Sequence, residues 1–349
     1  MRPVHGRVIP RITLICQIII AVFKRSVLLK KHPGLKQGLR WGLVLLVLTG
    51  LGLLLKQSFQ AQSFQNLLLQ AHYPWLLASA GLVLSELLLK ALRLRLLAQP
   101  FAIQHSFRNW LRIQVLGIAL ATVTPGRLGE VAKVFLMAEK APDKWGLSLL
   151  LCIFERLLDF LLLCLLGLLL SLSLLPAGPL PLLMGLLLGF LLLGLFSFLR
   201  FQHLWQELLP LLPLKIQQVL REYLHHREKL LPQLLPVWLL TCLIWLLNAC
   251  FQWFLLFSIG KTVSLWIVTG INAILALAGI LALLPLGLGT TDLGAFFLYK
   301  QLLSLSTESI LFLMLASRAI GLSVLFGLAL PFGLRDLRKQ EFPAPPHEI

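Results

Sequence analysis

The sequence predicts an all-α polytopic membrane protein with about six spanning helices plus two re-entrant helical hairpins in an inverted repeat. The first observation is composition: 58% of the 349 residues are hydrophobic and 13% are charged, whereas a soluble domain carries roughly 25% charged residues. The second is length, because the runs 157–175 and 180–199 are almost entirely apolar and approach the roughly 20 residues that cross a bilayer core. The third is a set of polar residues that recurs at an offset of 162.

Basic residues orient the predicted spans. Lys and Arg cluster at 24–40, 90–112, 133–144, 200–229 and 335–339, and such clusters mark the cytoplasmic side of a membrane. The spans are therefore expected to run alternately outward and inward at 41–55, 75–89, 147–175, 180–199, 237–258 and 309–332. Both termini are predicted to be cytoplasmic.

The predicted domains are a basic N-terminal extension (1–36), a transmembrane domain (37–335) and a cytoplasmic tail (336–349). In the extension, the apolar stretch 12–23 is too short to span a membrane, and basic residues rather than a small-residue cleavage site follow it. We therefore expect an interfacial helix there. Within the transmembrane domain, the predicted repeat units cover about residues 75–175 and 237–333.

Composition also limits the partners and cofactors. The net charge of +17 could suggest nucleic acid, but the basic residues lie between apolar runs, where they set membrane orientation. We expect no nucleic-acid binding. The five cysteines lack metal-like spacing, so neither a metal nor another cofactor is predicted.

Polar residues inside the apolar segments recur in register, which predicts the repeat. Glu130 precedes Arg156 by 26 residues, and Asp292 precedes Arg318 by 26, so the two pairs are 162 residues apart. We predict two copies of one unit with opposite orientation. Repeats of this kind often bracket a transport site.

Two helix-breaking signatures predict the hairpins. The first covers 125–130 and reads Pro-Gly-Arg-Leu-Gly-Glu; the second covers 285–292 and contains a proline, two glycines and an aspartate. Proline removes a backbone donor and glycine relaxes helical geometry, so each signature breaks a helix. The flanking arms at 111–123 and 128–137 are long enough to reach only about the middle of a membrane. Each hairpin should therefore enter and leave by one face, and the two tips should approach each other.

The candidate substrate-binding residues come from these signatures and from charges deep in the neighbouring helices. A helix that starts after a break offers free N–H groups and suits an anion, and arginine holds phosphate with two parallel hydrogen bonds. The candidates are Pro125, Gly126, Arg127, Gly129, Glu130, Glu155, Arg156, Asp159, Gly287, Gly289, Asp292 and Arg318. The alternative is a buried network in which Arg156 and Arg318 pair with Glu130, Asp159 and Asp292 and bind no ligand.

Glu86 and Lys90 are a further pair of charges in an apolar segment. Their spacing predicts an i,i+4 ion pair near the cytoplasmic end of a helix. For Lys90, snorkelling to the interface competes with a role in transport. The residues 162 positions later, Asn248 and Gln252, are polar too.

Five motifs occur in a fixed order: Ala91-Leu92-Arg93, the signature 125–130, Glu155-Arg156-Leu157-Leu158-Asp159, the Gly-rich turn 285–289, and Arg318. Together they resemble the transmembrane region of lysylphosphatidylglycerol synthases and the stand-alone flippase-like proteins related to it, over about residues 37–335. The resemblance implies transfer of an aminoacylated phospholipid to the outer leaflet. We expect the cytosolic synthase domain of the bifunctional members to be absent.

The predicted function is a lipid flippase or transporter, not an enzyme, that moves a phospholipid or polyprenyl-phosphate-linked lipid between leaflets. Its predicted partners are the bilayer and a membrane lipid with a phosphate headgroup, with a homo-oligomer or a separate lipid-modifying enzyme left open. One alternative is an intramembrane lipid-modifying enzyme, although no metal or Ser/His/Asp signature supports it. The other is a membrane scaffold that partners a separate synthase.

Overall fold

The computed structural model describes residues 60–124, 129–140, 144–174, 179–200, 214–281 and 290–341. The predicted extension (1–36) and first span (41–55) lie outside these residues, as do residues 125–128 and 282–289. The chain divides into two compact units, Ser58–Ala329 and a second that comprises Met1–Gln57 and Leu330–Ile349. The described residues of the second unit, 330–341, are the end of the last helix. All the contacts described below lie within the larger unit.

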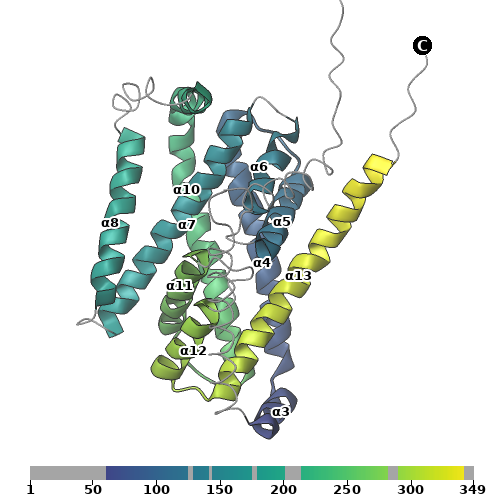
Figure 1. The fold of residues 1–349 in the computed structure, drawn as a ribbon, viewed down its shortest axis with the longest axis vertical. Coiled ribbons are helices and arrows are strands. Elements are labelled where there is room, and N and C mark those ends of the chain that lie inside the picture. Colours follow the sequence, from purple (N-terminus) through teal and green to yellow (C-terminus); the bar gives the residue numbers. More distant parts are fainter. Residues whose placement is uncertain are drawn as a thin grey trace, which may run out of the picture. The chain divides into compact units, whose positions relative to one another are not determined.

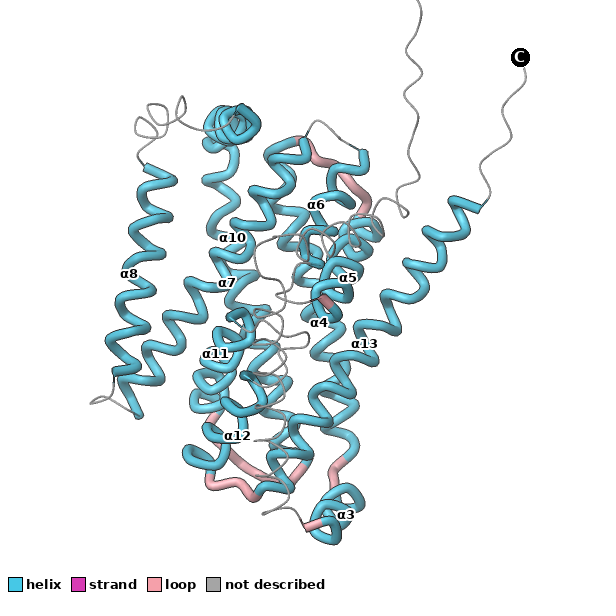
Figure 2. The backbone as a smooth tube through the Cα atoms, in the orientation of Figure 1, coloured by secondary structure: helices cyan, strands magenta, loops and turns pink. Residues whose placement is uncertain are grey.

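Every regular element in the described residues is a helix, which confirms the predicted all-α class (Figures 1 and 2). The elements are α3 (Ala61–Gln70), α4 (Tyr73–Ala98), η1 (Gln99–Phe101), α5 (Phe107–Val123), α6 (Val131–Met137), η3 (Ala138–Lys140), α7 (Trp145–Leu174), α8 (Pro179–Arg200), α10 (Leu214–Ser258), α11 (Leu265–Leu281), α12 (Thr290–Leu303) and α13 (Thr307–Glu341).

Three helical segments of the described chain are long and apolar enough to cross a membrane. They are Tyr73–Phe101, Leu230–Ser258 and Thr307–Arg335, each with 29 residues, and they contain three of the predicted spans. The helices α7 and α8 occupy two further predicted spans. Large apolar side chains such as Leu77 and Phe190 are 77% and 74% exposed, as expected where a helix faces lipid. The total of six spans remains a prediction.

The helix α10 is longer than the predicted span 237–258. It begins at Leu214, so the basic segment 214–229 is helical. Leu220 and Leu230 are buried in the core that α4 and α7 also build, which gives this part of the helix a packed face. Pro232 and Pro236 lie inside α10, where the missing backbone donors favour a kink.

The helices α4 and α10 pack antiparallel. The His72 N–H at the start of α4 donates to the carbonyl of Ser258 at the end of α10, at 2.8 Å. Further along, Asn248 contacts Glu86 and then Thr241 contacts Arg93. Residue numbers therefore rise along one helix as they fall along the other.

The helices α5 and α6 form the arms of the first predicted hairpin. The Thr124 hydroxyl donates to the Leu120 carbonyl at 2.8 Å and accepts the Gly129 N–H at 2.7 Å, so it ties the two arms together. A Cβ at Gly129 would collide with the backbone of Leu120, which requires glycine at this close approach. The arms have 17 and 7 residues; the second is too short for a full span, whereas the first is longer than the predicted 111–123 and reaches the lower limit of about 17 residues for a span.

The helices α11 and α12 are the arms of the second predicted hairpin, with 17 and 14 residues. Figure 1 shows α5 with α6 toward one end of the larger unit and α11 with α12 toward the other. The element order after α4 is repeated after α10, and the starts of α7 and α13, Trp145 and Thr307, are 162 residues apart. The order and the antiparallel direction are those that an inverted repeat predicts. That the hairpins re-enter one membrane face remains a prediction.

Candidate functional site

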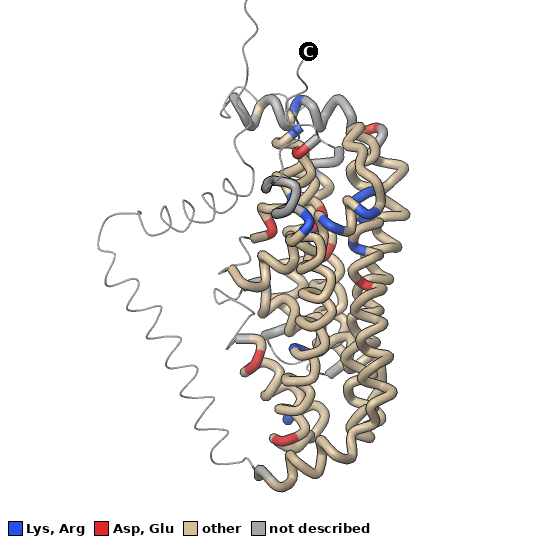
Figure 3. Tube along the Cα trace, turned by 90° about the vertical axis from the view of Figure 1, so that its right-hand side faces the viewer, with Lys and Arg blue, Asp and Glu red and all other residues tan. Residues whose placement is uncertain are grey.

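Six ionisable side chains meet where α4, α7 and the start of α6 come together. We call them the ion cluster: Arg93, Glu130, Lys133, Glu155, Arg156 and Asp159. Figure 3 marks the Lys and Arg positions of the described chain in blue and the Asp and Glu positions in red. Three cations face three carboxylates, so the ion cluster carries no net charge.

Arg93 on α4 lies at the centre of the ion cluster. Its side chain is 0% exposed; Nη1 lies 2.6 Å from Asp159 Oδ1, and Nη2 lies 2.8 Å from Glu155 Oε1. Nη1 also donates to the Thr241 hydroxyl at 3.1 Å. Because a buried charge is costly unless it is paired and hydrogen-bonded, these contacts allow Arg93 to lie between apolar helices.

Lys133 and Arg156 pair with the remaining carboxylate oxygens. Lys133 Nζ lies 3.3 Å from Glu155 Oε2. Arg156 Nε lies 2.9 Å from Glu130 Oε2, and its Nη1 lies 3.2 Å from Asp159 Oδ2. The structure thus pairs Arg156 with Glu130 and Asp159, as the alternative of a buried ion-pair network predicts.

Neighbouring residues hold the ion cluster in place. The Trp245 indole N–H donates to Asp159 Oδ1 at 3.0 Å, and the Gln114 amide donates to Glu155 Oε1 at 3.4 Å. Gly117 on α5 leaves room for the Lys133 side chain, which a Cβ at that position would strike. Glu155 and Asp159 are thus enclosed by partners, and this geometry favours the ion-pair network over direct ligand contact for both residues.

We call the predicted repeat units 75–175 and 237–333 the first and second halves. A second ion pair with the same spacing lies in the second half. Arg318 Nη2 on α13 donates to Asp292 Oδ1 on α12 at 2.6 Å. The Arg318 side chain is 31% exposed, whereas that of Asp292 is 7% exposed. Arg318 is therefore accessible, unlike Arg93.

The other members of the ion cluster have no charged counterpart at the 162-residue offset. Arg93, Lys133, Glu155 and Asp159 correspond to Leu255, Ala295, Ser317 and Gly321. Three of these replacements, Ala295, Ser317 and Gly321, are small, and each lines one or both of two adjoining cavities. Open space thus occurs in the second half where the first half holds charged side chains.

The polar cavity has a volume of about 390 Å³, within the range of about 300–1,000 Å³ typical of small-molecule sites. Its polar lining includes the side chains of Asn248, Gln252, Asn272, Tyr299 and the Asp292–Arg318 pair. It lies against α10, α11, α12 and α13.

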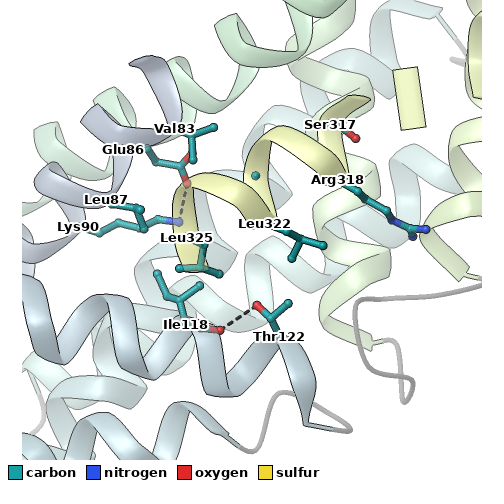
Figure 4. Close-up of a pocket in the computed structure, with 11 residues that line it drawn as sticks. Val83, Glu86, Leu87, Lys90, Ile118, Thr122, Ser317, Arg318, Leu322 and Leu325 are labelled. Carbon is teal, nitrogen blue, oxygen red and sulfur yellow. Dashed lines mark hydrogen bonds and ion pairs between the residues drawn. The ribbon is translucent and has the colours of Figure 1, made fainter. Parts of the chain in front are cut away.

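The apolar cavity has a volume of about 250 Å³, and five aliphatic side chains give it a mostly apolar surface. In Figure 4, Leu322 and Leu325 of α13 face Ile118 and Thr122 of α5, while the Glu86–Lys90 pair lies beside the same stretch of α13. Arg318 extends away from that pair. The two cavities share four lining residues, namely Glu86, Lys90, Ser317 and Arg318.

A chain of hydrogen bonds links the two halves along the polar cavity. Asn272 Nδ2 donates to Asn248 Oδ1 at 2.8 Å, and Asn248 Nδ2 donates to Glu86 Oε2 at 2.9 Å. Lys90 Nζ lies 2.5 Å from Glu86 Oε1. Glu86 and Asn248 are 162 residues apart, so each contacts its own counterpart in the other half.

The predicted site residues divide into four groups. Pro125, Gly126, Arg127, Gly287 and Gly289 lie outside the described residues. Glu130, Glu155, Arg156 and Asp159 belong to the ion cluster, whereas Asp292 and Arg318 line the polar cavity. Gly129 packs on the opposite arm of its hairpin.

Sequence reasoning missed several residues that the structure places at these sites. Arg93 and Lys133 had no assigned role, and the polar cavity adds Asn248, Gln252 and Asn272. An isolated amide inside an otherwise apolar helix, as at Asn272, was the available signal. Among the described residues, no group of three or more His, Cys, Asp or Glu side chains is arranged to hold a metal ion.

Comparison with known proteins places this arrangement in a family. A family model described as the lysylphosphatidylglycerol synthase TM region matches residues 41–329, and none of the curated proteins compared with the chain matches it. The matched region contains the ion cluster and both cavities, and it covers more than four-fifths of the 349 residues. The family is membrane-associated and lipid-related. The chain therefore belongs to the lysylphosphatidylglycerol synthase TM region family.

Proposed function

We propose that this membrane protein is a flippase or transporter that moves a phospholipid or a polyprenyl-phosphate-linked lipid between leaflets. The observation that carries the proposal is the polar cavity adjoining the apolar cavity, with four lining residues in common. A lipid needs both environments, because its headgroup loses hydrogen bonds in an apolar site and its chains gain from leaving water.

The helix arrangement supports movement between two membrane faces. The first helices of the two halves, α4 and α10, run in opposite directions. The contacts of His72 with Ser258 and of Asn248 with Glu86 show this antiparallel packing. In transporters built from inverted repeats, one unit moves against the other around a central site. The proposal includes six spans, two re-entrant hairpins and cytoplasmic termini, in a bacterial inner membrane.

Arg318 is the proposed phosphate contact. One of its terminal nitrogens donates to Asp292, and a guanidinium has further N–H donors in a fixed fork that matches phosphate. Partial exposure of the side chain leaves those donors accessible. Arg156, with a side chain 25% exposed, is its proposed counterpart in the first half.

Substitution of Arg318 tests this contact. In proteoliposomes that contain a fluorescent phospholipid, a membrane-impermeant quencher measures movement to the outer leaflet. Arg318→Ala should stop that movement and leave the thermal unfolding transition in place, because the residue is not fully buried. Arg108→Ala is the matched control, since Arg108 is an exposed arginine on α5 away from both cavities. Lipid movement at the wild-type rate in Arg318→Ala would show that Arg318 is not the phosphate contact.

Filling the apolar cavity tests the site by another route. A Cβ at Gly321 or at Gly327, both on α13, meets no atom within 4 Å, so a side chain can begin at either position without a backbone shift. Gly321 lines the apolar cavity and Gly327 does not. Gly321→Leu should slow lipid movement at least about tenfold, because an occupied cavity excludes its ligand, whereas Gly327→Leu should match the wild type. Equal rates in the two variants would remove the apolar cavity from the proposal.

A further inference from the structure

The polar cavity offers hydrogen-bonding groups that a phosphate alone does not need. The amides of Asn248, Asn272 and Gln252 all line it. Each amide carries both donors and an acceptor oxygen, whereas a phosphate diester only accepts hydrogen bonds. The Asn248 oxygen already accepts from Asn272. A ligand that complements the remaining amide groups must therefore donate as well as accept.

The charges that line the polar cavity are already paired. Lys90 Nζ lies 2.5 Å from Glu86, and Arg318 Nη2 lies 2.6 Å from Asp292. The lining as a whole is therefore neutral. The remaining N–H donors of Arg318 are assigned to the phosphate, so a second charged group on the ligand would enter the cavity without a counter-ion of its own, and an unpaired buried charge is costly. This favours an uncharged headgroup beyond the phosphate.

Gln252 and Tyr299 provide hydrogen-bonding groups that remain available. Within the part of the chain that the structure describes, no hydrogen bond joins the Gln252 amide or the Tyr299 hydroxyl to another residue. Tyr299 and Trp245 also bring aromatic rings to the lining. Such rings combine an apolar face with a polar tip, which suits a ring-shaped ligand that has C–H faces and hydroxyl edges.

Building on the proposed transport of a phosphate-linked lipid, we propose that the polar cavity recognises an uncharged, hydroxyl-rich headgroup, a sugar or a cyclic polyol. A hydroxyl group both donates and accepts hydrogen bonds, so it satisfies amide N–H and carbonyl groups together. Gln252 and Tyr299 are the specificity-determining residues. The apolar cavity, next to the shared residues Glu86 and Ser317, receives the start of the hydrocarbon chain.

Competition between two charge-matched lipids tests the recognition. The full-length protein in detergent is incubated with equal amounts of dioleoyl phosphatidylinositol and dioleoyl phosphatidylserine, and mass spectrometry measures the lipid retained after purification. Both probes have the same chains and the same net charge, but only phosphatidylinositol has a cyclic polyol headgroup. The wild type should retain phosphatidylinositol over phosphatidylserine by about fivefold, the effect expected of one or two net hydrogen bonds.

Two variants identify the residues responsible. Gln252→Leu should bring the retained lipids close to equal amounts, whereas Gln301→Leu, at an exposed position near the end of α12, should keep the wild-type ratio. Tyr299→Phe removes one hydroxyl without changing side-chain shape, and it should lower the ratio even if Gln252→Leu unfolds. Equal retention of the two lipids by the wild type, or a wild-type ratio in both cavity variants, would overturn the recognition.

The same measurements separate this inference from the transport function. If the wild type retains phosphatidylinositol selectively but moves no lipid in proteoliposomes, the recognition stands and the flippase proposal fails. If it moves both lipids equally well and retains them equally, the flippase proposal stands and the recognition fails.

Discussion

The two halves of this protein carry the same ion pair in different surroundings. In the first half, Arg156 and Glu130 belong to a cluster of six ionisable side chains. In the second half, Arg318 and Asp292 line a cavity instead. Four substitutions at equivalent positions separate the two arrangements, each replacing a charged residue of the first half with Leu, Ala, Ser or Gly.

This difference indicates that the two halves have different roles. A neutral, mutually paired cluster with little exposed surface resists rearrangement, because separating its members would leave buried charges without partners. The second half has open volume and accessible polar groups. We infer that the first half mainly fixes helix positions and that the second half mainly contacts the ligand.

The largest expected effect comes from breaking the ion cluster. Arg93→Leu removes a side chain with 0% exposure and leaves Glu155 and Asp159 short of a cation. Such a change should lower the free energy of unfolding by about 3–5 kcal/mol. Denaturant titration in detergent, followed by far-UV circular dichroism, measures the loss.

The equivalent test in the second half is Arg318→Leu. Arg318 is partly exposed, and its loss leaves one carboxylate, Asp292, without this cation, whereas Arg93→Leu affects two; we therefore expect a clearly smaller loss of stability than for Arg93→Leu. Similar losses for the Arg93 and Arg318 variants would contradict the proposed division between a structural half and a binding half.

An intermediate effect is expected from a pair of equivalent glycines. A Cβ at Gly117 would strike the stem of Lys133, whose amine is held by Glu155, whereas a Cβ at Gly279 would lie 3.0 Å from the Thr291 methyl group. Gly117→Ala should therefore cost about 1–3 kcal/mol of stability through overpacking. Gly279→Ala should cost clearly less, and thermal unfolding in detergent compares the two. If the order were reversed, the first half could not be the more tightly packed one.

The smallest expected effect concerns a peripheral ion pair that only the first half contains. Arg112 Nη1 lies 3.2 Å from Glu139 Oε2, and the two side chains are 17% and 35% exposed; the equivalent positions hold Ile274 and Gln301. Arg112→Leu should change the free energy of unfolding by about 0.2–1 kcal/mol. A loss as large as that of Arg93→Leu would show that charge pairing stabilises the first half beyond the ion cluster itself.

The sequence predicted ion pairs of the candidate site, but not what they bind. The alternative of a buried network paired Arg156 and Arg318 with Glu130, Asp159 and Asp292, and the structure joins Arg156 to Glu130 and Asp159 and joins Arg318 to Asp292. These pairs could be predicted because each one joins residues that are close in sequence, on neighbouring helices of one repeat unit. The all-α class followed from composition and from the apolar runs for the same local reason.

The remaining features depend on contacts that are distant in sequence. Arg93 meets Glu155 and Asp159 across 62 and 66 residues, and no periodic pattern encodes such a pairing. Small residues line the cavities, Ala295 and Gly321 among them. A charged residue in an apolar helix can be recognised in the sequence, whereas a small residue there does not show whether it borders a cavity.

The hydrogen bond between Glu86 and Asn248 has an evolutionary consequence. A residue on a two-fold axis contacts its own copy. In a dimer of two identical chains, Glu86 would therefore contact a second Glu86. Two glutamates facing each other would repel, and one would have to remain protonated. Joining the two units in one polypeptide removes that constraint and lets a carboxylate face an amide. At this position, covalent fusion permits a contact that a symmetric homodimer could not make.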